Sequence, residues 1–366
     1  MRRARKVAFV SVVPSPYQRD LFSALAQRPE LDVRIFYLER AAPDSPWPHN
    51  ELAQYEEVIP GSWFPLWRAR WHFNWPLPNL LQFDLAVLNI PANAITTQWL
   101  MRRNCYGTPW IFWGERLRLQ SNPWKRRVQK TLTAPFGNAT AIVGVGSAAE
   151  EDYRRRFPNT SHFNIPYYCD LSGFLARPRR PPVPGEMTFL FCGQMNERKG
   201  VDLLFKAFDR LVAENLNVRL LLVGREGQLP QFIQDLSVKA RDRIRYAGFQ
   251  PPERLPEYFA QADAFVLASR YDGWGVVVNQ ALGAGLPIIC SDAVGAGHDL
   301  VEENVNGLRF RSDDAAELQR CMEQVLNNPE TTWNWGEASR RKAVSLDPKV
   351  GAEKWVEVFR ALERTQ

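Results

Sequence analysis

The sequence predicts an α/β protein of two domains, each built on a parallel sheet. Short apolar runs alternate with amphipathic stretches of helical periodicity through both halves of the chain, which is the pattern of parallel α/β sheets. The chain of 366 residues is long enough for two domains of ordinary size. A proline-rich stretch, residues 176–185, separates the two series, because proline removes a backbone donor and fixes φ.

The first half of the chain, residues 1–175, forms the first predicted domain. Its apolar runs predict strands at Val7–Val13, Val33–Leu38, Leu85–Asn89, Trp110–Trp113 and Ala141–Val145. Stretches with helical spacing predict helices at Tyr17–Gln27, Thr97–Arg103, Trp124–Leu132 and Ala148–Arg155.

After the linker at 176–185, a second series of elements predicts a domain over residues 186–349. The expected strands are Thr188–Cys192, Val218–Val223, Ile244–Ala247 and Ala264–Ala268. The expected helices are Val201–Glu214, a segment after Pro230, and Pro252–Ala260. The last stretch, residues 350–366, has apolar residues at helical spacing and predicts a terminal helix.

The composition is that of a globular protein, since 45% of the residues are hydrophobic and 23% are charged. Five widely spaced cysteines without a CxxC pattern favour a reduced compartment and give little support to a zinc site. The basic N-terminus resembles a signal peptide, but its apolar run is short and meets Pro14 and Pro16, which favours a buried strand. No stretch reaches the ~18 apolar residues that a spanning helix needs. We expect a cytoplasmic protein, either free or peripheral on the inner face of the membrane.

The net charge of +6 is concentrated in one segment of the first domain. Between Trp99 and Thr131, eight basic residues accompany a single acid, Glu115, and aromatic residues are interleaved with them. A second aromatic cluster occupies residues 63–75. This mixture fits adsorption to an anionic membrane surface or docking of a lipid-linked phosphate, and the alternative is a solvated basic face beside ordinary core aromatics. No nucleic-acid-binding motif accompanies the charge, so we expect no nucleic-acid partner.

A glycine-spaced turn in the second domain predicts an anion site. In the sequence Asp272-Gly273-Trp274-Gly275-Val276-Val277, two glycines flank a bulky aromatic residue just before a predicted helix. Glycine lets the backbone turn tightly, and the first amides of the helix favour a bound anion such as a diphosphate. Asp before Gly is also a common turn pair, which leaves a purely structural role open for Asp272.

A second glycine turn lies about 80 residues earlier. Gly193 and Gln194 follow a predicted strand, and Arg198 and Lys199 precede a predicted helix. Glycine allows the close approach of a phosphate, and a lysine at the start of a helix adds a mobile positive charge. Alone, this pattern is weak, because a lysine and a glycine before a helix can form a structural cap.

Together, these two segments resemble the signatures of glycosyltransferase family 4, a retaining group 1 glycosyl transferase family with the GT-B fold. The resemblance implies two Rossmann-like domains that face each other across a cleft, with the donor mainly on the second domain and the acceptor on the first. It also implies that the terminal helix 350–366 packs back on the first domain. The signature has a carboxylate, seven residues and a glutamate, and here Asp272 and Gln280 occupy those places. Lys199 matches, whereas Gln194 replaces an arginine.

The resemblance assigns roles to individual residues. It places Asp272 near the transferring sugar, Lys199 and Arg198 on the diphosphate, and Gln280 on the donor ribose. The predicted donor-binding residues are Gly193, Gln194, Arg198, Lys199, Gly224, Arg225, Phe249, Gly273, Trp274, Gly275, Val276, Val277 and Gln280.

The first domain provides the predicted acceptor side. Its first loop contains no glycine, and Tyr17 or Arg19 could face an acceptor. Glu115 follows a predicted strand at the edge where open α/β sheets present functional residues, so it joins Asp272 and Lys199 as a predicted catalytic residue. The alternative is that Glu115 is a surface partner of Arg116 or Arg118.

The predicted function is therefore that of a retaining glycosyltransferase of hexosyltransferase type. It would move a sugar from a nucleoside-diphosphate sugar to an acceptor hydroxyl in polysaccharide or lipid-linked glycan biosynthesis. Fixed hydrogen-bond donors and cations stabilise the leaving diphosphate, so neither a metal nor a cofactor is expected. The alternatives are a GT-B sugar-nucleotide epimerase and a catalytically weak sugar-nucleotide-binding protein. The second alternative arises because Gln194, Asp272 and Gln280 depart from the residues that the family carries at these three positions. A dehydrogenase is disfavoured, since no GxGxxG follows the first strand.

Overall fold

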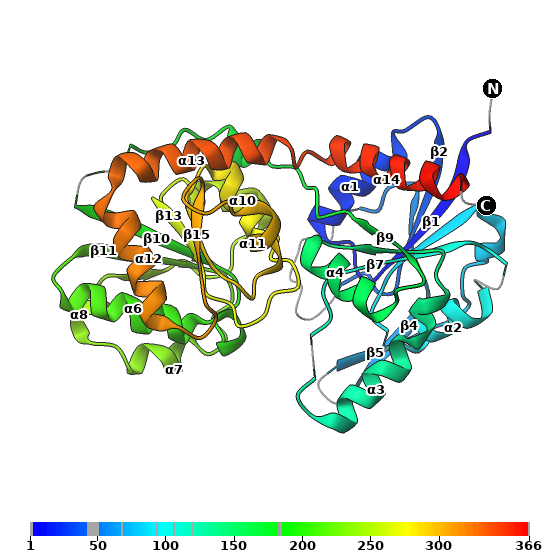
Figure 1. The fold of residues 1–366 in the computed structure, drawn as a ribbon, viewed down its shortest axis with the longest axis horizontal. Helices are drawn as coiled ribbons and strands as arrows, with labels where there is room; N and C mark the ends of the chain where they lie inside the picture. The colour runs from blue at the N-terminus through cyan, green and yellow to red at the C-terminus, as the bar shows by residue number, and fades with distance from the viewer. Residues whose placement is uncertain are drawn as a thin grey trace. The chain divides into compact units, whose positions relative to one another are not determined.

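The computed structural model describes residues 3–41, 51–66, 69–92, 94–104, 107–118, 120–181, 183 and 185–364. The chain forms two compact units, and each contains a parallel sheet with helices packed around it (Figure 1). The first unit comprises Met1–Cys169 and Pro348–Gln366, and the second comprises Asp170–Asp347. The α/β class predicted from the alternating apolar runs is confirmed.

Within the described residues, the first unit has a seven-stranded parallel sheet in the order β3-β2-β1-β6-β7-β8-β9. The strands are β1 (Arg5–Ser11), β2 (Leu31–Tyr37), β3 (Glu56–Val58), β6 (Leu85–Asn89), β7 (Trp110–Gly114), β8 (Ala141–Gly144) and β9 (Ser161–Asn164). All five strands expected from the apolar runs are present. The short strands β3 and β9 were not predicted, because neither contains an apolar run.

Helices cover the first sheet and close its core. They are α1 (Pro16–Ala26), η1 (Leu80–Gln82), α2 (Ile95–Trp99), the π-helical turn η2 (Leu100–Asn104), α3 (Pro123–Thr133), η3 (Ala134–Asn138), α4 (Ser147–Arg156) and the terminal helix α14 (Pro348–Glu363). Helix α14 packs on α1 (Figure 1), and its Trp355 ring lies 5.4 Å from Phe9 and 5.3 Å from Trp113. This aromatic contact fixes the terminal helix within the first unit.

The aromatic cluster at residues 63–75 forms an antiparallel hairpin that was not predicted. Its strands are β4 (Gly61–Leu66) and β5 (Ala69–Asn74). The buried Asn74 anchors the hairpin, since its side-chain amide donates to the carbonyls of Leu38 (2.8 Å) and Ile59 (3.0 Å). Every residue of β4 is exposed, so the strand has no alternation of buried and exposed positions from which it could have been predicted. Trp67 and Arg68 of the cluster lie outside the described residues, as do Cys105 and Tyr106 in the basic segment.

In the part of the second unit that the structure describes, six parallel strands follow the order β12-β11-β10-β13-β14-β15. They are β10 (Glu186–Cys192), β11 (Asn217–Val223), β12 (Ile244–Tyr246), β13 (Ala264–Leu267), β14 (Ile288–Ser291) and β15 (Gly307–Phe310). The helices are α5 (Ser172–Leu175), η4 (Glu197–Lys199), α6 (Val201–Ala213), α7 (Leu229–Gln234), α8 (Val238–Arg241), η5 (Pro252–Arg254), α9 (Leu255–Phe259), α10 (Val277–Ala284), α11 (Gly295–Leu300), α12 (Ala315–Asn327) and α13 (Pro329–Val344).

The boundary between the units falls after Cys169, slightly earlier than the predicted boundary at residue 175. Helix α5 packs on α10, and the guanidinium of Arg179 lies 3.9 Å over the ring of Trp333 and 2.7 Å from the carboxylate of Glu337. The predicted linker at 176–185 therefore packs against the second unit instead of standing apart from it. Pro182 and Pro184 in this stretch lie outside the described residues.

Candidate functional site

The two glycine-containing loops of the second unit meet where the strand order of its sheet reverses. From β10 the chain adds β11 and β12 on one side, and then β13, β14 and β15 on the other. The loop after β10 carries Arg198 and Lys199, and the loop after β13 carries Asp272. Open α/β sheets bind their ligands at the carboxyl ends of the strands at such a switch point.

Lys199 and Asp272 form the centre of this site. Lys199 Nζ lies 2.5 Å from Asp272 Oδ2, and Arg198 Nη1 lies 3.8 Å from Asp272 Oδ1. Ser269 Oγ donates to Asp272 Oδ2 at 3.4 Å. Asp272 is only 8% exposed, so its negative charge is largely removed from water and held by these two cations. The structure therefore brings Asp272 together with Arg198 and the neighbouring Lys199, which lies 73 residues earlier, and all three residues were predicted.

The start of α10 places backbone amides beside this charge cluster. Gly275 has φ +93°, a conformation that favours glycine, and it leads directly into Val276 and Val277 at the start of the helix. Amides in the first turn of a helix have no partner within the helix and attract an anion. Gln280, in the first turn of α10, is half-buried. The glycine turn and the helix start on which the predicted anion site depends are therefore both present.

Trp274 requires a correction to the predicted site. Its side chain is fully buried, and its indole N–H donates to Asn279 Oδ1 at 3.0 Å. The side chain therefore holds the turn on α10 and presents no atom at the surface of the site. The adjacent Gly273 is packed tightly, because a Cβ at Gly295 would lie 2.1 Å from its carbonyl oxygen.

The loops after β10, β11 and β12 are linked by close backbone contacts. Gly193 N donates to Val223 O at 2.8 Å, and Gly224 N donates to Gly248 O at 2.8 Å. A Cβ at Gly224 would lie 2.0 Å from Gly193 O, so no side chain fits between these loops. These contacts set Gln194, Arg225 and Phe249 on the same edge of the sheet. Gln194 and Phe249 are exposed there, and Arg225 is half-buried.

Arg270 is a positioning residue that was missed in the sequence. Its guanidinium binds Asp202 through Nη1 (2.7 Å) and Nη2 (2.8 Å), and Nε lies 2.5 Å from Asp313. Nη1 also donates to the carbonyl of Glu197, just before Arg198 and Lys199. Burial raises the pKa of Asp202, but the bonds from Arg270 outweigh burial and leave this pKa below its usual value. Arg270 thereby fixes the loop that carries the two cations, and only its place in the loop that follows β13 (Ala264–Leu267) could have signalled this.

In the first unit, a buried polar network lies at the carboxyl ends of β1 and β6. Gln18 is buried, and its side-chain carbonyl accepts from Ser11 Oγ (3.0 Å) and Ser15 Oγ (2.9 Å). Its amide donates to Asn89 Oδ1 at 2.6 Å, and Asn89 Nδ2 donates to Trp113 O at 2.8 Å. The glycine-free first loop is therefore fixed by a side-chain network and not by a close backbone approach.

Tyr167 connects this network to Glu115. Burial raises the pKa of Tyr167 well above its usual value, and the negative charge of Glu115 raises it further, so the phenol stays protonated. The ring of Tyr17 packs 5.0 Å from the ring of Tyr167. Tyr153 Oη donates to the backbone carbonyl of Glu115 at 2.7 Å. Glu115 and Tyr17, both predicted for the acceptor side, thus surround one buried tyrosine that was not predicted.

Arg19 has a different environment from the one expected. Its guanidinium binds Glu56 through Nε (2.9 Å) and Nη2 (2.6 Å). Tyr37 Oη and Ala53 N also donate to Glu56, at 2.7 and 2.8 Å. Burial raises the pKa of Glu56, but the hydrogen bonds from Arg19, Ala53 and Tyr37 together lower it below its usual value. This pairing holds the guanidinium of Arg19 against the first residue of β3.

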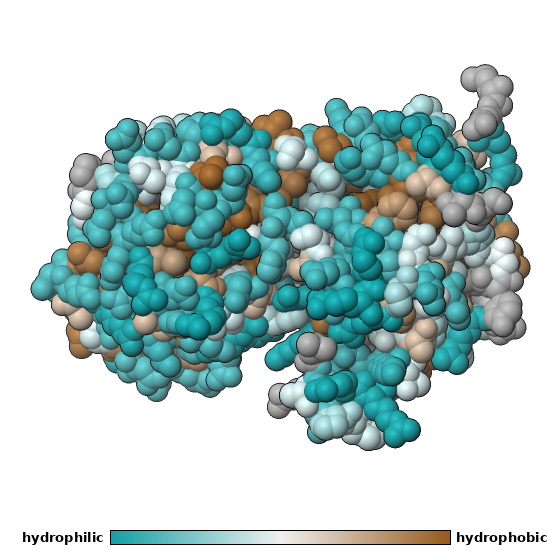
Figure 2. Space-filling view, viewed as in Figure 1, coloured by the Kyte–Doolittle hydropathy of each residue, from teal (hydrophilic) through white to brown (hydrophobic). Residues whose placement is uncertain are grey.

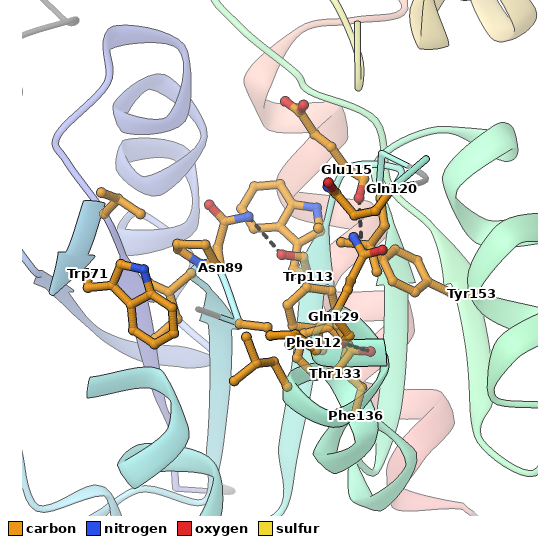
Figure 3. A pocket seen from close by; sticks show the side chains of 18 of the residues that line it. Trp71, Asn89, Phe112, Trp113, Glu115, Gln120, Gln129, Thr133, Phe136 and Tyr153 are labelled. Carbon is orange, nitrogen blue, oxygen red and sulfur yellow. Dashed lines mark hydrogen bonds between the residues drawn. The ribbon is translucent and has the colours of Figure 1, made fainter. Parts of the chain in front are cut away.

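A cavity of about 640 Å³ opens beside this network, entirely within the first unit. Figure 3 shows Glu115 at one end of it, with its carboxylate directed away from the rings of Trp113, Phe112 and Phe136. Asn89 lies between Trp71 and Trp113 in the same view. The cavity thus has a polar end and a long apolar wall.

Among the described residues, no group of three or more His, Cys, Asp or Glu side chains lies close enough together to hold a metal ion. None of the helices in the described ranges is both long and apolar enough to cross a membrane.

Solved structures share the fold of the chain. A sucrose-phosphate synthase from Thermosynechococcus elongatus superposes with a TM-score of 0.74 at 20% identity, over 99% of this chain and all of that one. Anabaena HepE, solved in complex with UDP, gives a TM-score of 0.71 at 16% identity, over 98% of this chain and all of that one. The predicted fold class, a GT-B glycosyltransferase fold of two Rossmann-like domains, is confirmed.

The sequence of the second unit is similar to a known family. Residues 176–342 match the family model of the glycosyl transferases group 1, in agreement with the resemblance found in the sequence. An uncharacterised glycosyltransferase of Methanocaldococcus jannaschii is 29% identical over 145 residues, which is 39% of this chain and 36% of that protein. The glycogen synthase of Mycobacterium tuberculosis is 28% identical over 188 residues, 50% of this chain and 45% of that protein. The O-antigen chain mannosyltransferase B of Escherichia coli is 33% identical over 106 residues, 28% of each chain. The chain matches less than half the length of each of these relatives.

Proposed function

We propose that this protein is a retaining glycosyltransferase that moves a hexose from a nucleoside-diphosphate sugar to an acceptor hydroxyl without a metal ion. The observation that carries the proposal is the position of Lys199 and Arg198 against Asp272, beside the first amides of α10 and at the switch point of the sheet. The match of residues 176–342 to group 1 glycosyl transferases supports it. The assignment to family 4 rests on the spacing of Asp272 and Gln280.

The proposed chemistry uses the charges of this site. When the bond between sugar and diphosphate breaks, negative charge develops on the leaving diphosphate, and fixed donors aimed at that charge lower the barrier. In the structure, Lys199 neutralises Asp272. A bound diphosphate would compete for that ammonium group, which leaves the Asp272 carboxylate to face the sugar. Gln280 would bond a ribose hydroxyl through its amide, more weakly than a carboxylate would.

We place the acceptor on the first unit, at the polar end of the cavity. Glu115 and the protonated phenol of Tyr167 are the groups that could bind a hydroxyl there, and Gln18 would position Asn89 beside them. Tyr17 would pack against the acceptor from the first turn of α1. An acceptor in polysaccharide or lipid-linked glycan biosynthesis fits the neighbouring basic segment. We further propose that the protein acts in the cytoplasm, at an anionic membrane surface.

Product analysis tests this proposal against its two alternatives. The protein is incubated with a panel of nucleoside-diphosphate sugars, with and without acceptor extracts, and the products are separated by chromatography and mass spectrometry. A transferase releases free nucleotide and a glycosylated acceptor. An epimerase converts the donor without any acceptor, and a binding protein leaves the donor intact.

Restoring the family's glutamate at position 280 tests the alternative that the protein is a catalytically weak sugar-nucleotide-binding protein. Gln280→Glu is expected to strengthen donor binding by about three- to tenfold, because a charged oxygen bonds ribose hydroxyls more strongly. A large gain in turnover in Gln280→Glu would favour a weakened enzyme. Complete loss of turnover would show that Gln280 is adapted to this donor.

A further inference from the structure

The cavity in the first unit has walls of unlike character. Its lining includes the hairpin β4–β5, the segments that follow β6 and β7, and one face of α3. The hairpin contributes Leu66 and Trp71, and α3 contributes Val128 and Leu132. A volume of about 640 Å³ is within the range of about 300–1,000 Å³ that is typical of small-molecule sites.

The register of the hairpin explains its apolar wall. Phe64 pairs with Trp71, and Ser62 pairs with Phe73, so these four side chains share one face of the hairpin together with Leu66. His72 and Asn74 point to the opposite face and are buried against the sheet. One face of the hairpin is therefore anchored, while the other presents aromatic and aliphatic groups to the cavity and to solvent.

Helix α3 is divided in a similar way. Trp124, Lys125, Val128, Gln129, Leu132 and Thr133 line the cavity at helical spacing. The other face carries the exposed Arg126, Arg127 and Lys130, and the helix contains no acidic residue. Figure 2 shows the lower end of the first unit, where Figure 1 places α3, as mostly hydrophilic. Trp124 is 56% exposed at the rim. A cation-rich helix thus borders an apolar cavity.

We propose that this cavity binds the apolar chain of an anionic, lipid-linked acceptor, with the phosphate of the acceptor at Lys125 and its hydroxyl-bearing end toward Glu115 and Asn89. The proposal rests on the proposed transferase function and specifies the class of its acceptor. A polar glycan alone would leave the wall of Leu66, Trp71, Val128 and Leu132 exposed to water. An amphiphile covers that wall and matches the charge of α3, and both contacts favour binding.

Isothermal titration calorimetry of the full chain tests the proposal. The probes are hexyl, octyl and decyl phosphate below their critical micelle concentrations, together with inorganic phosphate. Because each buried methylene contributes about 0.8 kcal/mol, affinity is expected to rise roughly fourfold per carbon, and therefore by about 15-fold from hexyl to octyl phosphate. Equal affinity for inorganic phosphate and all three alkyl phosphates would overturn the proposal, because the site would then recognise charge alone.

Matched variants of α3 locate the bound chain. Val128→Asp places a carboxylate on the cavity face and is expected to abolish the dependence on chain length. Thr131→Asp adds the same charge on the exposed face of the same helix and should retain that dependence. Val128→Phe keeps the wall apolar but fills the cavity, so decyl phosphate should bind at least tenfold more weakly. A chain-length dependence unchanged in both Val128 variants would place the amphiphile elsewhere, as in general adsorption to membranes, and would overturn the proposal.

The change in Tm of the same variants on addition of UDP, GDP or ADP separates this proposal from the proposed function. A nucleotide shift without alkyl phosphate binding would overturn the lipid-linked acceptor and leave the transferase intact. Chain-length-dependent binding without any nucleotide shift would support the cavity as an amphiphile site and overturn the transferase to which we attach it.

Discussion

Replacing Lys199 with methionine separates a catalytic role of this residue from a structural one. Lys199 and Asp272 are both largely buried, and their charged atoms lie 2.5 Å apart. In Lys199→Met, Asp272 keeps only Arg198 at 3.8 Å and Ser269 at 3.4 Å. We expect a loss of about 2 kcal/mol in unfolding free energy, which lowers the Tm of a unit of this size by roughly 4–8 °C. We also expect kcat/KM to fall by about 100- to 1,000-fold, because a cation on the leaving diphosphate is lost.

The double variant Lys199→Met with Asp272→Asn tests whether the stability lost in Lys199→Met comes from the unpaired charge of Asp272. It removes both charges, so most of the lost stability should return, whereas activity should remain low. Lys206→Met on the exposed side of α6 is the matched control and should change neither quantity. The assays are thermal unfolding and steady-state transfer from the donor found by product analysis. If the double variant recovers activity together with stability, Lys199 acts only as a partner of Asp272 and the reasoning is refuted.

Three further predictions concern the supporting structure. Gly224→Ala should destabilise the second unit by more than about 3 kcal/mol, because the new Cβ would meet Gly193 O at 2.0 Å. Gly248→Ala, which also has positive φ but has open space around it, should destabilise the unit by only about 1 kcal/mol, and chemical denaturation measures both free energies of unfolding. Glu56→Gln should lower the Tm at pH 7. Since the pKa of Glu56 is lowered in the folded state, the stability that its carboxylate contributes is present above about pH 4.3 and is lost as the pH falls through the folded-state pKa. The Tm difference between Glu56→Gln and the parent protein should therefore vanish at low pH, and a difference that stays constant with pH would contradict this. Gln18→Leu removes the hydrogen-bond partner of Ser11 Oγ and of Asn89 Oδ1. It should reduce acceptor turnover at least tenfold in steady-state kinetics, while the nucleotide Kd measured by calorimetry stays unchanged.

The fold could be predicted where burial imposed a pattern on the sequence. Strand β6 begins and ends at the predicted residues, because Leu85–Asn89 is a short apolar run at the centre of a sheet. The hairpin β4–β5 could not be predicted, since β4 is exposed along its whole length and its pairing depends on the distant contacts of Asn74. Strand β9 was missed for a related reason, because its four residues lack an apolar run.

The site was predictable where backbone conformation required particular residues. The glycine at position 275 has positive φ, and the spacing from Lys199 to Asp272 identified two loops that the structure joins. The sequence does not show which way a side chain points, so Trp274 was assigned to the donor although it is buried. Gln18 was missed because a glutamine in the first turn of a helix is ordinary until Ser11, Ser15 and Asn89 are seen around it.

The measurement that tests the central claim most directly is thermal unfolding of the full chain in EDTA with UDP, GDP, ADP and their sugar conjugates. A nucleotide at about 100 times its dissociation constant adds roughly 2.7 kcal/mol of stability, a shift of several degrees. We expect such a shift with one base family, and we expect Lys199→Met to reduce it. No shift with any nucleotide would contradict a metal-independent donor site at Lys199 and the start of α10.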